Sequence, residues 1–193
     1  MKTMTYRTFF ELEREPFSSD IALESILKTP ALTGVEERIR YALGLGAMAL
    51  VTGEIGSGKS TSLRYVTGRL HPSEYRTLYI TASTGSVLEL YRQMLHVLGM
   101  DMGGVSRAVM LRRIRQEIIE WVQGKKMKML LVIDEASLLR LEVFAELHTL
   151  TQFEKDSKPI LPIVLAGQSN LIDNLMYRSS LPLASRIVGR SHL

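Results

Sequence analysis

Short apolar runs alternate with amphipathic segments along most of this chain of 193 residues. The runs that predict buried strands cover residues 48–52, 77–81, 129–133 and 160–166. Spacing typical of amphipathic helices covers residues 35–45, 59–70, 86–98, 106–122 and 137–153. Strands that alternate with helices predict a parallel sheet with helices on both faces. We therefore expect an α/β fold, a three-layer αβα sandwich around a mostly parallel central sheet.

The pattern predicts one folded domain preceded by an arm. Residues 1–33 contain prolines and show no regular apolar spacing, which favours an irregular N-terminal arm. Residues 34–193 are assigned to the folded core. Its most loop-like stretches are residues 99–105 and 154–159, and the sequence shows neither an internal repeat nor a low-complexity tract.

The amino-acid composition excludes cysteine-based chemistry and indicates the class of protein and of partner. The chain is 46% hydrophobic and 23% charged, typical of a soluble globular protein, and it contains no cysteine. Disulfides, thiolate metal sites and cysteine nucleophiles are therefore excluded. The N-terminus carries acidic residues and lacks the apolar core of a signal peptide, so we expect a cytoplasmic protein. A net charge of +4 favours an anionic partner such as nucleic acid, although many nucleotide enzymes are as basic, so charge alone does not decide the partner.

A phosphate-binding loop is predicted between the first strand and the helix after it. The pattern G-x-x-x-x-G-K-[ST] is matched by Gly53-Glu54-Ile55-Gly56-Ser57-Gly58-Lys59-Ser60-Thr61. Glycines let such a loop wrap closely around phosphates, whose charge its backbone N–H groups and Lys59 offset. Ser60 is placed to hold Mg²⁺ and Thr61 to contact the α-phosphate. A glycine-rich turn that matches by chance is the alternative, and the flanking strand and helix argue against it.

A second part of the site is expected where two later strands end. The apolar run 129–133 ends in Asp134 and Glu135. Because ligands of open α/β sheets bind at the carboxyl ends of strands, Asp134 is a candidate Mg²⁺ ligand, and Glu135 would orient or deprotonate the attacking water. The alternative is that both carboxylates cap the next helix. Gln168, after the run 160–166, is a candidate γ-phosphate sensor or else an ordinary polar loop residue.

These motifs, with further segments, resemble AAA+ ATPases related to ExeA/GspA of general secretion and to the TnsC/MuB-like helper ATPases of bacterial transposons. The similarity includes Phe9-Phe10…Pro16-Phe17, the block from Glu146 to Ser157, the segment Val164–Gln168, and the tail Leu183-Ala184-Ser185-Arg186-Ile187…Arg190-Ser191-His192-Leu193. The resemblance implies the P-loop NTPase (AAA+/ASCE) fold, ATP and Mg²⁺ as cofactors, and ATPase activity. Relatives continue into a small helical lid, which we expect this chain to lack because it ends at Leu193.

The resemblance also implies roles for single residues. Gln168 takes the place of the sensor, and Arg186 that of an arginine finger that reaches the γ-phosphate of a neighbouring copy in a homo-oligomer. Arg178 and Arg190 are weaker candidates. Without the family pattern, Arg186 reads equally well as a surface arginine on a short helix. Adenine recognition is expected from the arm near Phe17 and from the start of the helix predicted at residues 35–45.

Three functions stay open at this stage. The first is an ATP-dependent helper of transposition that binds double-stranded DNA and a transposase. The second is an ATPase of secretion-system assembly with a membrane secretion component as its partner, and the third is a nucleotide switch with little turnover. For DNA binding the sequence offers a basic cluster on helix 106–122 and after it, consisting of Arg107, Arg112, Arg113, Arg115, Lys125, Lys126 and Lys128. The alternative is that these side chains are only the solvated face of an amphipathic helix.

Overall fold

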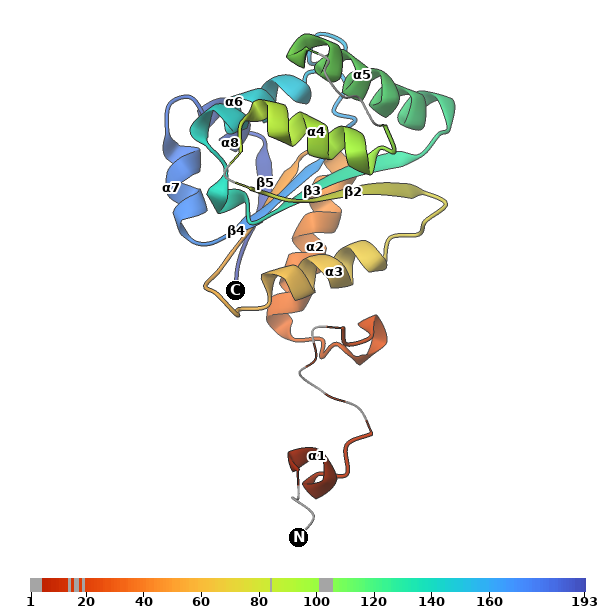
Figure 1. The fold of residues 1–193 in the computed structure, drawn as a ribbon, viewed down its shortest axis with the longest axis vertical. Coiled ribbons are helices and arrows are strands. Elements are labelled where there is room, and N and C mark those ends of the chain that lie inside the picture. Colours follow the sequence, from red (N-terminus) through yellow and green to blue (C-terminus); the bar gives the residue numbers. More distant parts are fainter. Residues whose placement is uncertain (1–4, 14, 16–17, 19, 84, 101–105) are drawn as a thin grey trace.

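Five strands form one parallel sheet in the order β2-β3-β4-β1-β5 (Figure 1). The computed structural model describes residues 5–13, 15, 18, 20–83, 85–100 and 106–193. The strands are β1 (Met48–Thr52), β2 (Tyr75–Thr81), β3 (Lys128–Asp134), β4 (Ile163–Gly167) and β5 (Ile187–His192). The predicted α/β fold with a parallel sheet is confirmed.

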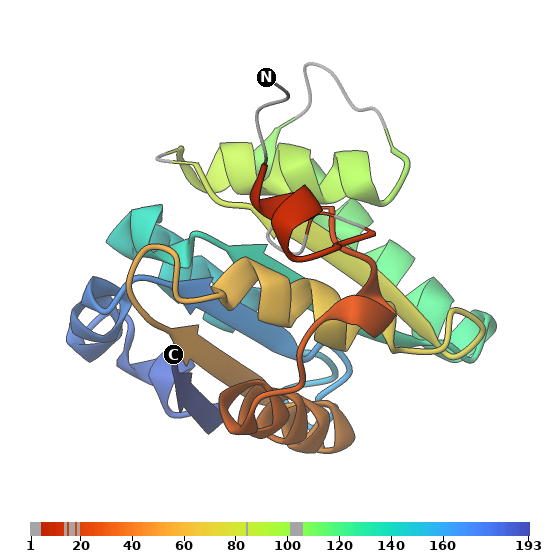
Figure 2. The ribbon, with the colours of Figure 1, turned by 90° about the horizontal axis from the view of Figure 1, so that it is seen from below.

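Helices cover both faces of the sheet, because neighbouring side chains of a strand point to opposite sides. In β1, Met48 and Leu50 pack with the helices α4 (Val87–Val97), α5 (Arg107–Ile119) and α6 (Leu141–Leu150). The intervening Ala49 and Val51 pack with α2 (Pro30–Leu45) and α3 (Lys59–Gly68) (Figures 1 and 2). All five side chains of β1 are buried, which explains why the strand reads as a continuous apolar run.

Helix α2 begins earlier than its apolar spacing indicates. It begins at Pro30, and the Thr29 hydroxyl accepts a hydrogen bond from the backbone N–H of Leu32 (3.1 Å). Proline suits the first position of a helix because its missing N–H would have no partner there. The helix ends at Gly46, whose φ of 65° is left-handed. The last residues of the segment assigned to the arm are therefore helical.

Two other helices differ from their predicted bounds. Helix α5 ends at Ile119 and continues as a π-helical turn, Glu120–Gly124. The single predicted helix 137–153 is divided into a 3₁₀ turn, Ala136–Leu138, and α6. The backbone is extended at Leu139 and Arg140, with ψ of 141° and 149°, which interrupts the helix.

The C-terminal part of the fold was not predicted. Helices α7 (Asn170–Met176) and α8 (Leu181–Ala184) lead into β5, which pairs with β1 at the edge of the sheet. Gly189 is the one buried residue of β5, so this strand has no apolar run. At the other end of the chain, α1 (Tyr6–Phe9) lies on an arm that extends away from the body (Figure 1). No helix in the described part of the chain is long and apolar enough to span a membrane.

Candidate nucleotide site

The order of the strands brings the three predicted parts of the site together. Strand β4 lies between β1 and β3. The phosphate loop follows β1, Asp134 ends β3 and Gln168 follows β4. Because all three strands are parallel, their carboxyl ends meet at one edge of the sheet, where open α/β sheets bind ligands.

The phosphate loop has a backbone that only glycine adopts readily. Gly56 and Gly58 have φ angles of 80° and 93°, and a β-carbon at either position would meet no atom within 4 Å. The constraint is therefore the left-handed backbone and not crowding. Helix α3 begins directly after Gly58, so its first N–H groups and the positive end of its dipole face the loop.

Lys59 and Ser57 fit a bound phosphate. The Lys59 side chain is buried, and its ammonium group donates to the carbonyl oxygens of Gly53 (3.0 Å) and Glu54 (2.8 Å). The buried hydroxyl of Ser57 has no hydrogen-bond partner in the described chain. A buried cation and an unpaired buried donor at the same loop are what a phosphate would satisfy.

Asp134 is held by two hydrogen bonds. One carboxylate oxygen accepts from the backbone N–H of Glu135 (2.9 Å), and the other accepts from the hydroxyl of Tyr79 in β2 (2.7 Å). Neither Asp134 nor Glu135 caps the following turn with its side chain, so the capping arrangement is absent from this part of the structure. Burial, followed by the bond to Asp134, raises the pKa of Tyr79, which therefore stays a hydrogen-bond donor at neutral pH.

Glu135 has an unusual backbone for a non-glycine residue. Its φ of 54° and ψ of 31° are left-handed, which costs energy for a side chain with a β-carbon. The side chain is only partly buried. This conformation turns the chain sharply between β3 and the Ala136–Leu138 turn, directly beside the end of β4.

Hydrogen bonds of Gln168 and of the next residue, Ser169, connect the end of β4 to the segment after Glu135 and to the phosphate loop. The N–H of Gln168 donates to the Ser137 hydroxyl (3.4 Å), two residues beyond Glu135. The hydroxyl of Ser169 donates to the Glu54 carboxylate in the phosphate loop (3.1 Å). The Gln168 side chain itself is partly exposed and has no hydrogen-bond partner among the described residues.

The donor set suits Mg²⁺ only together with a nucleotide. The described residues contain no group of three or more His, Cys, Asp or Glu side chains that could hold a metal ion by themselves. The hydroxyl of Ser60 and the carboxylate of Asp134 are hard oxygen ligands, and Mg²⁺ is usually bound by such side chains together with phosphate oxygens and water. The residues present therefore fit Mg²⁺ bound with ATP.

Comparison with known proteins agrees with this geometry. The sequence pattern of the family described as AAA domain matches residues 44–175, from the end of α2 through α7. This chain belongs to the AAA domain family. General secretion pathway protein A of Aeromonas hydrophila is 31% identical over 197 residues, which is 97% of this chain and 34% of that protein. The AAA domain described here thus spans about a third of the length of that relative.

Solved structures share the fold. Cdc6p of Pyrobaculum aerophilum matches with a TM-score of 0.69 at 19% identity, over 91% of this chain and 48% of that one. The ORC1 protein of Aeropyrum pernix, solved in complex with DNA, matches with a TM-score of 0.65 at 17% identity, over 86% of this chain and 45% of that one. These matches establish a P-loop AAA+ fold, which the resemblance had implied.

Arg186 lies at the opposite edge of the sheet from the phosphate loop of its own AAA domain. Its carbonyl oxygen accepts from the N–H of Met48, where β1 begins (3.0 Å). Its guanidinium donates to both carboxylate oxygens of Asp156 (2.6 and 2.7 Å) and contacts Thr151 and His148 (3.3 Å each). Arg186 follows α8 and is partly buried, so it is not a free surface arginine on a helix. The weaker candidates Arg178 and Arg190 are exposed.

The arginines of α5 fall into two classes. Arg107 pairs with the buried carboxylate of Glu146, and Arg115 donates to the carbonyl oxygen of Gln152 and stacks on the ring of Phe153. Arg112 and Arg113 are exposed and have no partner among the described residues. The buried residues of α5 are Met110, Ile114 and Ile118, at the four-residue spacing of an amphipathic helix.

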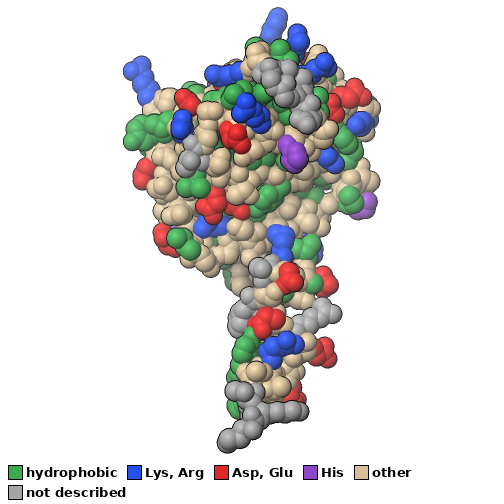
Figure 3. Space-filling model, viewed as in Figure 1, with side chains coloured by type: hydrophobic (Ala, Val, Ile, Leu, Met, Phe, Trp, Pro, Cys, Tyr) green, Lys and Arg blue, Asp and Glu red, His purple; other side chains and the backbone are tan. Residues whose placement is uncertain are grey.

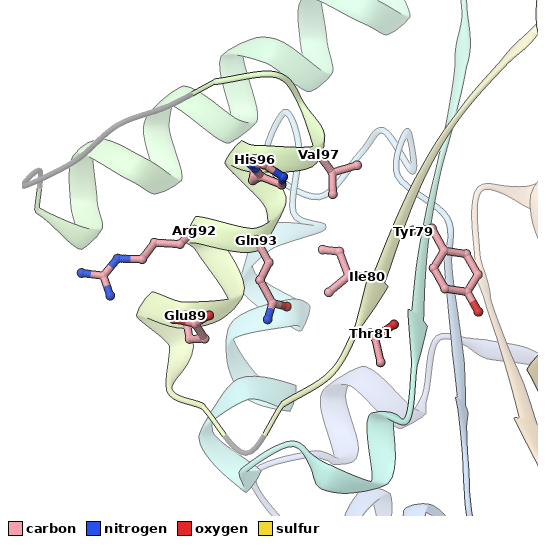
Figure 4. Close-up of a pocket in the computed structure, with 8 residues that line it drawn as sticks. All are labelled: Tyr79, Ile80, Thr81, Glu89, Arg92, Gln93, His96 and Val97. Atoms are coloured by element: carbon pink, nitrogen blue, oxygen red, sulfur yellow. The ribbon is translucent and has the colours of Figure 1, made fainter.

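A cavity of about 430 Å³ lies between β2 and α4. Tyr79, Ile80 and Thr81 line it on the strand side, and Gln93, His96 and Val97 are among the lining residues of α4 (Figure 4). The Tyr79 ring points away from α4 (Figure 4), toward Asp134. None of the phosphate loop, Asp134, Glu135 and Gln168 lines this cavity.

Tyr79 is the residue of the site that sequence reasoning missed. It lies in β2, paired in register with Val132, so adjacency of strands alone brings its hydroxyl to Asp134. No motif spacing relates the two residues. Phe17, expected near adenine, lies outside the described residues.

Proposed function

We propose that this AAA domain hydrolyses ATP with Mg²⁺ when copies of it assemble. The observation that carries the proposal is the buried Lys59 in a phosphate loop at the same sheet edge as Asp134, Glu135 and Gln168. Lys59 and the loop N–H groups hold the β- and γ-phosphates, and Glu135 orients or deprotonates the attacking water. Ser60 and Asp134 would hold Mg²⁺, which supplies charge neutralisation at the phosphates. Gln168 contacts the γ-phosphate.

The position of Arg186 supports action between copies. It lies at the amino edge of the sheet, where it cannot reach the phosphate loop at the carboxyl edge of its own chain. When a neighbouring copy's nucleotide site lies against it, the Arg186 guanidinium would leave Asp156 and bind the γ-phosphate of that neighbour. An arginine that stabilises charge on the transferred phosphoryl group is worth about 10³–10⁵ in rate.

Two substitutions test the nucleotide site. We expect Lys59→Ala to abolish binding of a fluorescent ATP analogue, because it removes the buried cation that faces the phosphates. Glu135→Gln should bind ATP as the wild type does and lose hydrolysis by at least about 10²-fold, because the amide cannot accept a proton. Normal phosphate release by Glu135→Gln would refute the catalytic assignment. Negligible release by assembled wild-type protein would favour the nucleotide switch.

As the biological role we propose an ATP-dependent helper of transposition that binds double-stranded DNA and engages a transposase. Basic side chains gather at the end of the molecule where α5 lies (Figure 3). Arg112 and Arg113 are exposed there without carboxylate partners in the described chain, so they are available for phosphates.

DNA binding can be tested with a random-sequence duplex and ATP, ADP or no nucleotide. We expect binding that requires ATP and Lys59. In the charge-reversed variant Arg112→Glu/Arg113→Glu, affinity should fall and depend less steeply on salt, because fewer counterions are released. Lys28→Glu/Arg140→Glu, which changes two exposed basic residues elsewhere, is the matched control. Equal affinity of both variants across salt would remove α5 from the proposed interface.

A second role is favoured by the relative named General secretion pathway protein A, which is 31% identical over 97% of this chain. In this alternative, the ATPase acts in assembly of a secretion system and its partner is a membrane component. Failure to bind DNA in every nucleotide state, with ATP hydrolysis intact, would favour this role over transposition.

A further inference from the structure

The N-terminal arm carries aromatic side chains that its own chain leaves exposed. No residue of α1 is buried, and Tyr6, Phe9 and Phe10 are 46%, 62% and 65% exposed. The rings of Phe9 and Phe10 pack edge to face, with centroids 4.8 Å apart. Burying such rings is strongly favourable, and clustered exposed apolar side chains typically mark a contact surface.

The arm leaves the body at the end that holds the phosphate loop. The carbonyl of Ile21 accepts from Arg64 in α3 (2.6 Å), and Leu23 packs against Gly68 at the end of that helix. The chain is thus fixed to the body from Ile21 onward, whereas α1 extends beyond it (Figures 1 and 3). Helix α2 runs from the arm to the start of β1 (Figure 1), so its last residue lies at the amino edge of the sheet and its first residue lies toward the opposite end.

An apolar groove lies at the other end of α2. It has a volume of about 280 Å³, and its lining includes Leu45, Tyr75, Val122, Pro159 and Ile160. Leu45 is 49% exposed. The sixteen residues of α2 separate this groove from the base of the arm by about 24 Å. A smaller hollow beside it shares Gly46 and Pro159 and is also lined by Arg186.

Charge on the arm complements charge at the groove. Glu11 and Glu13 follow the aromatic pair and are exposed. At the groove, Lys128 is a lining residue, and Lys125 and Lys126 precede it on the chain. All three lysines are exposed, and none is paired with a carboxylate in the described residues. Residues 9–13 combine two aromatic rings with two carboxylates, although Arg7 lies one turn earlier on α1. An apolar groove with a lysine rim complements that segment in both respects.

We propose that the arm of one copy docks in the groove of a second copy, with Phe9 and Phe10 against Leu45 and Ile160 and with Glu11 facing the lysines. Arm and groove lie at opposite ends of the molecule, so the contact is head to tail and extends to a ring or a filament. It would also bring Arg186 of the second copy toward the nucleotide site of the first. This last step rests on the proposed function, whereas the docking itself does not.

The absence of cysteine from the sequence allows a clean test. Phe10→Cys and Leu45→Cys are prepared separately, one with a size tag, mixed, and treated with a short bismaleimide. We expect a dimer that contains both variants, formed in several-fold higher yield than with the control pair Phe10→Cys and Tyr177→Cys. Tyr177 is 54% exposed and lies away from the groove, after α7.

Two further samples separate the possible outcomes. Adding Lys125→Glu/Lys126→Glu to the Leu45→Cys chain should lower the yield, and adding Lys59→Ala should leave it unchanged because docking does not use the nucleotide. Efficient cross-linking of chains that keep Lys59 but release no phosphate from ATP would therefore refute only the proposed function. A yield no higher than that of the control pair would overturn the docking. So would cross-linking confined to single chains of a Phe10→Cys/Leu45→Cys protein, which would show that the arm folds back on its own groove.

Discussion

At the scale of the residue, the hydroxyl of Tyr79 fixes the orientation of the Asp134 carboxylate. It donates to one carboxylate oxygen while the N–H of Glu135 occupies the other. Both bonds hold the carboxylate in one orientation before any ligand binds. Asp134 is the Mg²⁺ ligand of the proposed function, and removal of a hydrogen-bond partner of a metal ligand typically changes metal affinity by about 10–100-fold.

Tyr79→Phe removes the hydrogen-bond donor and keeps the ring. We expect it to raise the Mg²⁺ concentration that gives half-maximal ATP hydrolysis by about tenfold. A titration of ATPase rate against Mg²⁺ at saturating ATP measures the effect. Tyr177→Phe, at an exposed tyrosine at the end of α7 with no hydrogen bond to Asp134, should titrate as the wild type does. If Tyr79→Phe also titrates as the wild type, the phenol does not position Asp134.

At the scale of the element, α6 meets the residue before β5 through the contact of His148 with Arg186. Burial, followed by the charge of Arg186, lowers the pKa of His148 below its ordinary 6.5. Hydrogen bonds from Arg186 lower the pKa of Asp156, which therefore stays ionised through the same range. The folded protein thus takes up the His148 proton at a lower pH than the unfolded chain does.

The sign of this linkage predicts loss of stability on acidification. The contribution of a neutral His148 is complete above pH 6.5 and falls below it, because the unfolded chain binds the proton first. Urea unfolding between about pH 7.5 and pH 5.5 should show a smaller loss for His148→Gln than for the wild type. His71→Gln, at an exposed histidine, is the control and should follow the wild type. An identical pH slope for His148→Gln and wild type would contradict the prediction.

The elements that sequence could predict are those with a strong apolar pattern. The run 48–52 coincides with β1, because both faces of that strand are buried. Strand β5 gave no such signal, since an edge strand with one buried residue has no apolar periodicity. The division of the helix predicted at 137–153 was also hidden, because α6 keeps helical apolar spacing after the extended Leu139 and Arg140.

At the scale of the whole molecule, the order of the strands decides what the site contains. The pattern predicted that Lys59, Asp134 and Gln168 follow strands, but only the order β3-β4-β1 makes the three strand ends neighbours. Spacing along a chain does not carry that order, nor does it show that Arg186 meets Asp156. The same topology places Arg186 at the edge opposite the phosphate loop, so Arg186 cannot act at the phosphates of its own copy.

Mixing two inactive variants tests whether Arg186 of one copy acts at the nucleotide site of another. Lys59→Ala lacks the nucleotide site and keeps Arg186, whereas Arg186→Ala keeps the site and lacks the arginine. Each alone should lose about 10³-fold or more in phosphate release. An equimolar mixture should regain a measurable part, because Lys59→Ala chains supply Arg186 to the intact sites of their neighbours. The control replaces Lys59→Ala with the double variant Lys59→Ala/Arg186→Ala, which has no arginine to supply and should restore nothing. Equal release from both mixtures, or high activity of Arg186→Ala alone, would show that the arginine is not shared between copies.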